Sequence, residues 1–232
     1  MSPSFFQFAR AACLAALCAC TTARAGRPMV VDDAAIVDPG SCQVEAWTQR
    51  THGQREYWAM PACGVGGWEL GVGWGHVGTD DAAAYRTRAI RAKTVFHPLE
   101  TNGWGIGLTL ADQYREGGGL AGDLTALVPL SVSLLEDRVL LHANAGWTRP
   151  QATRRGGALW AAGLEWAVAG PFTLTLESYG TRRGHGYTQA GLRLDAIPGR
   201  LALDAGAGQR LGQGGAERYL TLGMTLSTPV LR

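Results

Sequence analysis

Residues 220–227 read Leu-Thr-Leu-Gly-Met-Thr-Leu-Ser, and this alternation decides the fold. Because successive side chains of a β-strand point to opposite faces, the large apolar residues share one face and the small or polar residues share the other. Residues 139–148 and 200–208 repeat the pattern, and about twelve such segments of roughly ten residues follow one another from residue 42 onward. The sequence therefore predicts an all-β fold, an antiparallel up-and-down transmembrane β-barrel of about 12 strands.

The predicted connections between these strands alternate in length. Tight turns are predicted at 63–66, 135–137, 169–171 and 197–199. Longer, polar links rich in glycine and arginine are predicted at 78–84, 115–121, 149–156, 181–186 and 209–216. Outer-membrane barrels join their strands by short periplasmic turns and longer external loops, so this alternation favours a membrane barrel. Two connections depart from it, since 97–103 is long for a turn and His52-Gly53 is short for a loop.

Aromatic residues fall at two levels when the strands are placed alternately up and down. The predicted periplasmic level holds Trp68, Phe96, Trp104, Trp166 and Phe172. The level at the other end holds Tyr114, Trp147 and Trp160. Ordinary core packing would explain any one of them, but the two interfaces of a membrane favour two such girdles.

The N-terminus has the three-part layout of a secretory signal, with Arg10, an apolar run at 11–19 and an A-x-A site ending at Ala25. We therefore expect a signal peptide at 1–25, a periplasmic N-terminal segment at 26–41 and the barrel at 42–232. A lipoprotein-type cut before Cys20 is the alternative. Export predicts the outer membrane of a Gram-negative cell, with membrane lipid, lipopolysaccharide and the barrel-assembly machinery as partners.

The mature chain has balanced charge. Without Arg10 and Arg24 the 21 basic residues fall to 19, which equals the 19 acidic residues. A neutral chain gives no reason to expect a nucleic-acid partner.

Two cysteines remain after the signal, Cys42 and Cys63, and an exported chain with two thiols predicts one disulfide. If His52-Gly53 is a two-residue turn, these cysteines face each other across a hairpin, close enough to bond. A turn at Pro198-Gly199 likewise sets Arg193 opposite Asp204.

The alternation also predicts eight ionisable residues that face the lumen. These candidates are Glu69, Arg91, Lys93, Glu165, Glu177, Arg193, Asp195 and Asp204. They would form either a selectivity or binding ring for a polar permeant or a salt-bridged cluster of side chains that fills the lumen. A barrel of this size has limited free interior, which favours the salt-bridged cluster. Glu177, Arg193 and Asp204 fall on successive predicted strands and could form one ladder.

A turn at Glu136-Asp137 would set Ser131 opposite His142 on the interior face, near Asn144. Such a group suggests nucleophilic catalysis, as in membrane-embedded lipid hydrolases. Those enzymes need a site on the lipid-facing wall, and the sequence has no nucleophile-elbow motif. Interior hydrogen bonding is the better interpretation, so we do not expect an enzyme.

The remaining polar residues predict no cofactor. Five histidines at 52, 76, 97, 142 and 185 lack the spacing of metal ligands, so no metal site is expected. Arg154-Arg155 and Arg182-Arg183 fall in predicted external loops, where they would contact lipopolysaccharide or simply be solvated.

Several stretches resemble the outer-membrane transporters of the MetA type, a family named for its link to meta-cleavage pathways of phenol degradation. The N-terminal matches are 27–34, Gly40, 42–45 and Trp47. The later matches are 142–146, 163–165, 176–180 and 189–193. The resemblance implies a transporter or channel for small, hydrophobic or aromatic molecules. The alternatives are a closed structural or interaction barrel and, more remotely, an outer-membrane lipid hydrolase.

Overall fold

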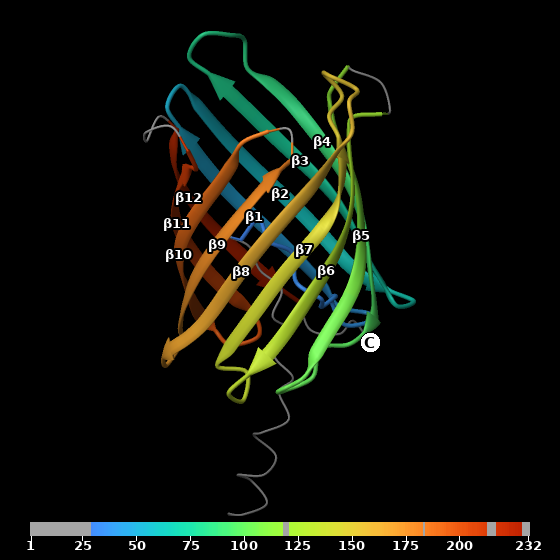
Figure 1. The fold of residues 1–232 in the computed structure, drawn as a ribbon, viewed down its shortest axis with the longest axis vertical. Helices are drawn as coiled ribbons and strands as arrows, with labels where there is room; N and C mark the ends of the chain where they lie inside the picture. Colours follow the sequence, from blue (N-terminus) through green and yellow to red (C-terminus); the bar gives the residue numbers. More distant parts are fainter. Residues whose placement is uncertain (1–28, 118–120, 183, 213–216, 229–232) are drawn as a thin grey trace, which may run out of the picture.

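The structure is a computed structural model that describes residues 29–117, 121–182, 184–212 and 217–228. Twelve antiparallel strands pair in chain order, and β1 pairs with β12 to close a barrel (Figure 1). The strands are β1 (Cys42–Thr51), β2 (Gln54–Val65), β3 (Trp68–Thr79), β4 (Tyr85–His97), β5 (Trp104–Arg115), β6 (Asp123–Leu134), β7 (Val139–Arg149), β8 (Gly157–Ala169), β9 (Phe172–Thr181), β10 (Gly186–Ile197), β11 (Leu201–Arg210) and β12 (Arg218–Ser227). The described residues include no helix that could cross a membrane. The predicted twelve-strand barrel is confirmed; the predicted signal peptide lies outside the described residues.

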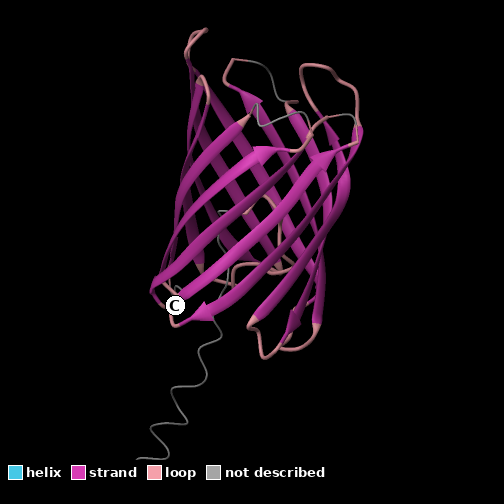
Figure 2. Ribbon diagram, turned by 60° about the vertical axis from the view of Figure 1, so that its left-hand side comes forward, coloured by secondary structure: helices cyan, strands magenta, loops and turns pink. Residues whose placement is uncertain are grey.

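The connections gather by length at the two ends of the barrel. The described part of the C-terminus ends beside the short turns, at the bottom of Figures 1 and 2, while most of the longer loops lie at the opposite end. The short-turn end includes the longer link at 98–103, and the loop end includes the two-residue turn at His52-Gly53, as expected. The turn predicted at 63–66 lies further along. β2 continues to Val65, and the chain turns at Gly66 and Gly67, which both have the positive φ that glycine adopts without strain.

The two faces of each strand differ in polarity, as the alternation predicts. On β12, Leu220 and Leu222 are 63% and 60% exposed on the outer face, whereas Thr221 and Thr225 are buried on the inner face. The aromatic residues predicted at two levels follow the same division, and Trp68, Phe96, Trp104, Trp147, Trp160, Trp166 and Phe172 are all exposed on the outside. Tyr114 is only half-buried at its position on β5. The outer wall is therefore broadly apolar.

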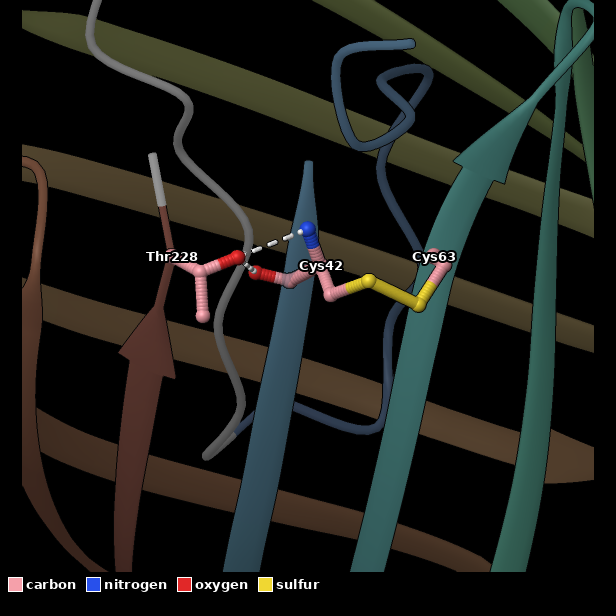
Figure 3. Close-up of a disulfide and its surroundings, with 3 residues drawn as sticks. All are labelled: Cys42, Cys63 and Thr228. Atoms are coloured by element: carbon pink, nitrogen blue, oxygen red, sulfur yellow. Dashed lines mark hydrogen bonds between the residues drawn. A yellow bond between two sulfur atoms is a disulfide. The ribbon is translucent and has the colours of Figure 1, made fainter. Parts of the chain in front are cut away.

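The predicted pairings across three hairpins are confirmed. Cys42 and Cys63 are opposed and joined by a disulfide, with their Cα atoms 4.1 Å apart (Figure 3). Arg193 is opposite Asp204, and Ser131 is opposite His142. The N–H of Cys42 also donates to the Thr228 hydroxyl, which donates to the Cys42 carbonyl, each at 3.0 Å. The start of β1 is thus tied on one side to β2 and on the other to the end of β12.

Candidate functional site

Residues 29–41, which we call the plug, lie inside the barrel (Figure 2). The plug begins against β9, where the N–H groups of Val30 and Val31 donate to Oε2 of Glu177 at 2.7 and 2.9 Å. Further along the plug, the N–H of Val37 donates to Oε2 of Glu69 on β3 at 3.0 Å. The plug ends where β1 begins. The plug therefore crosses the lumen from one wall to another.

Along residues 30–37 of the plug, interior side chains take the place of strand pairing. A buried backbone N–H needs an acceptor, and a segment outside a sheet must find it elsewhere. The N–H of Asp32 donates to Oδ1 of Asn144, and Nδ2 of Asn144 donates back to the Asp32 carbonyl, both at 2.7 Å. The N–H of Ala34 donates to Oγ of Ser131 at 2.8 Å, and Ser131 is also hydrogen-bonded to Nδ1 of His142. The polar inner face is thus complementary to the plug backbone.

Buried charges fix the middle of the plug. Nζ of Lys93 lies 2.7 Å from Oδ1 of Asp32 and 2.6 Å from Oδ1 of Asp33, and Thr109 donates to Oδ2 of Asp32 at 2.7 Å. Burial by itself would raise the pKa of Asp32, but the charges of Lys93 and Arg91 and these hydrogen bonds hold that pKa below its ordinary value. Asp32 is therefore held as a carboxylate while the plug is bound.

A second ion pair supports the plug from the wall. Nη2 of Arg91 donates to Oε1 of Glu69 at 2.7 Å and lies 3.8 Å from Oε2 of Glu45. The other carboxylate oxygen of Glu69 accepts the hydrogen bond from Val37. Arg91 thereby positions an acceptor of the plug backbone.

Glycines on the inner wall make room for the plug. A Cβ atom at Gly64 would lie 2.4 Å from the carbonyl oxygens of both Val37 and Asp38, and one at Gly163 would lie 2.5 Å from Cε of Met29. Met29 and Val31 are buried against Ala161, with Tyr179 packed beside them. Only residues without a side chain allow the plug this close to β2 and β8.

A cavity of about 590 Å³ lies between the plug and the loop end of the barrel. Met29, Val31 and Ala161 form an apolar part of its lining, and Glu45 and Arg91 form part of its polar lining. The plug is therefore the floor of a chamber with mixed walls.

A family model matches residues 13–228 of the chain. The chain belongs to the family described as uncharacterised conserved protein UCP029691. No curated protein matches this chain. The matching model is not that of the MetA-type transporters, so that resemblance stays a prediction.

Solved porin structures have a barrel similar to that of this chain. The KdgM porin matches with a TM-score of 0.63 and 7% identity, over 81% of this chain and 99% of that chain. The NanC porin matches with a TM-score of 0.61 and 11% identity, over 80% of this chain and 98% of that chain. A further KdgM structure is a complex with disordered oligogalacturonate. At these identities the likeness shows the fold.

All eight ionisable residues predicted to face the lumen lie on the inner face of the barrel, in two groups. Glu69, Lys93 and Glu177 hold the plug directly, Arg91 acts through Glu69, and Glu165 lies 3.3 Å from Nε2 of His142. Arg193, Asp195 and Asp204 form a separate group near the short turns, where Nε of Arg193 lies 3.3 Å from Asp195.

The strand register separates Glu177 from the other two members of the ladder predicted on β9–β11. The β9–β10 register sets Glu177 opposite Gln189 and sets Arg193 opposite Thr173. Glu177 thus lies two inner-face positions away from the level of Arg193 and Asp204, and its carboxylate faces the plug.

The plug, and the contacts that three barrel side chains make with it, were not predicted from the sequence. Residues 29–41 show no strand periodicity, and they were expected only to be a periplasmic segment. Ser131 and Asn144 were expected to make interior hydrogen bonds, but not with this segment, and Thr109 was not singled out. The available signal was the pair Asp32-Asp33, two adjacent carboxylates just before a barrel with lysine and arginine on its inner face.

Proposed function

We propose that this chain is an outer-membrane channel or transporter for small molecules, closed in this state by its N-terminal plug. The observation that best supports this proposed function is the plug, a non-strand segment held across the lumen by side-chain hydrogen bonds and ion pairs. A purely structural barrel would need neither an internal cavity nor a segment that closes it. The twelve-strand architecture shared with the KdgM and NanC porins supports the proposal.

The outer wall supports a membrane location. Large apolar residues are exposed along every part of the wall, and soluble proteins rarely expose an apolar surface of this extent. Exposed tryptophans near both ends fit the two membrane interfaces. With the expected signal peptide, we place the short turns in the periplasm, the longer loops outside the cell and assembly with the barrel-assembly machinery.

The way the plug is held allows it to move. Among the described residues, backbone contacts between the plug and the strands gather at its end, where Pro39 is bridged to Gly64 and Gly40 and Ser41 are hydrogen-bonded to Gly64. The polar contacts of residues 30–37 with the strands run to side chains, and water or a permeant entering the lumen can replace them. Release of residues 29–38 would leave the wall intact because the disulfide and the strand pairing begin at Cys42.

The competing function is a permanently closed structural barrel, and the buried ion pairs of Lys93 favour it. Conductance across a planar bilayer separates the two. We expect the refolded full chain to open rarely and a variant lacking residues 29–38 to give steady conductance steps. A Glu116→Gln variant, altered only on the loop side, should behave like the full chain. A folded deletion variant without any steps would rule out the channel.

The permeant class is a finer part of the proposal. The mixed lining of the chamber, together with the resemblance to MetA-type transporters, supports a small molecule with an aromatic or other apolar body and one polar group. Uptake into proteoliposomes tests this. An aromatic alcohol should enter faster than an acidic disaccharide of similar size, and the reverse order would contradict this permeant class.

No catalytic role is proposed for Ser131, His142 and Asn144. Ser131 and Asn144 bind the plug backbone, and the group faces the lumen rather than the lipid. Their hydrogen bonds support the interior-bonding interpretation.

A further inference from the structure

Two arginines face each other on the outer wall at the loop end of β1 and β2. The register pairs Arg50 directly with Arg55, and both side chains are exposed. They lie on the same face of the hairpin as Cys42 and Cys63, whose Cα atoms are 4.1 Å apart, so they occupy the same kind of narrow pair. Like charges directly opposed across a hairpin destabilise it unless an anion lies between them.

A third arginine extends this cluster to β12. Arg50 is opposite Leu220 on β12, and Arg218 is the next outward-facing residue beyond Leu220. The β1–β2 and β1–β12 registers therefore place all three arginines on adjoining strands of the outer face. The three guanidinium groups thus border one basic site.

These arginines differ from others near the same end of the barrel. Among the described residues, Arg50, Arg55 and Arg218 form no ion pair. Arg86 and Arg88, which also face outward, lie 3.9 and 2.6 Å from Glu116, and Arg210 lies 3.8 Å from Glu217. Positive charge is therefore left without a protein partner at this site on the wall.

The surroundings of the cluster indicate a lipid. Tyr57 and Leu220 are exposed on the outer face beside the arginines, and Leu222 continues the apolar surface below Leu220. A phosphate at the arginines would place attached acyl chains along this surface. Guanidinium groups bind phosphate through paired hydrogen bonds, which suits two arginines on adjacent strands.

We propose that Arg50, Arg55 and Arg218 form a binding site for the phosphate groups of a phosphorylated glycolipid in the outer leaflet. The acyl chains of this lipid pack against Leu220 and Leu222. The site is on the outer wall, so it is separate from the chamber and from the plug.

Binding of bisphosphorylated lipid A to the refolded full chain in neutral detergent tests the proposal. The readouts are native mass spectrometry and the shift of the unfolding temperature. We expect Arg50→Ala/Arg55→Ala to weaken binding at least tenfold and Arg50→Lys/Arg55→Lys to weaken it less, because lysine keeps the charge but not the paired hydrogen bonds. The matched control Arg86→Ala/Arg88→Ala should bind like the unaltered chain. Heat-dependent electrophoretic mobility establishes that each variant is folded.

Three results would overturn the proposal. Equal binding by the folded Arg50→Ala/Arg55→Ala variant would remove the arginines from the site. Equal binding of a phosphate-free form of the glycolipid would reduce the interaction to acyl contacts. Equal protection by inorganic phosphate at the same concentration would make free phosphate the ligand in place of a lipid.

Discussion

Lys93 is the residue on which the charge balance of the plug most depends. Its ammonium group is buried and is the partner of both Asp32 and Asp33. In Lys93→Met the two carboxylates would lose that partner inside the barrel, and breaking a buried pair in this way costs about 3–5 kcal/mol. We expect the plug to leave the lumen, and the open time measured in a planar bilayer to rise at least tenfold.

An exposed pair is the control for Lys93. Arg88 binds Glu116 on the outer face, where both side chains are more than a third exposed, and such pairs contribute about 0–1 kcal/mol. Arg88→Met should leave the open time unchanged. If Lys93→Met stays as closed as the unaltered chain, then the ion pairs are not what holds the plug.

Gly64 tests the contact between the plug and the wall. A Cβ atom there would lie 2.4 Å from two plug carbonyl oxygens, so Gly64→Val must displace residues 37–41. We expect the amides of Gly40 and Val37 to exchange hydrogen at least tenfold faster, measured by mass spectrometry.

Gly157 offers a matched glycine on β8, since a Cβ atom there would meet nothing within 4 Å. Gly157→Val should leave amide exchange in the plug as it is. Slow exchange of Gly40 in Gly64→Val would mean that the plug adjusts without leaving.

At the scale of the element, the outward face of β12 tests the membrane location. Leu222 is in the middle of the strand and 60% exposed. An arginine on the lipid-facing side near the bilayer centre costs about 2–4 kcal/mol, so Leu222→Arg should lower the free energy of unfolding in lipid vesicles by about that amount. Urea titration in vesicles measures it.

The same substitution in a loop provides the comparison. Leu211 is exposed just beyond the end of β11, and Leu211→Arg should change the free energy of unfolding little because the side chain remains in water. Similar, small effects at both positions would contradict a lipid-facing wall.

At the scale of the whole molecule, acid should release the plug. Since the bound plug holds the pKa of Asp32 below its ordinary value of 3.8, the released plug takes up a proton more readily. The contribution of Asp32 to closure is therefore complete above pH 3.8 and is lost as the pH falls through the lower pKa of the bound state. Conductance should rise in that acidic range, and Asp32→Asn should open at higher pH with a weaker pH dependence. Identical pH profiles for the two proteins would contradict the role of Asp32.

The sequence by itself determined the features that depend on local order along the chain. A side-chain period of two assigns Leu220 and Thr221 to opposite faces, and a two-residue turn at His52-Gly53 sets Cys42 opposite Cys63. The same periodicity puts Lys93 and Glu177 on the inner face. These inferences need only the strand geometry and the turn, so they held within each hairpin.

Only the tertiary structure decided what those inner residues bind. The hydrogen bonds of Val30 and Val31 to Glu177 join residues 147 and 146 positions apart. Barrel closure brings β3, β4, β7 and β9 around one segment that has no periodicity of its own. A short segment with neither helix nor strand pattern finds its place only once those walls exist, because its backbone hydrogen bonds must be supplied by distant side chains.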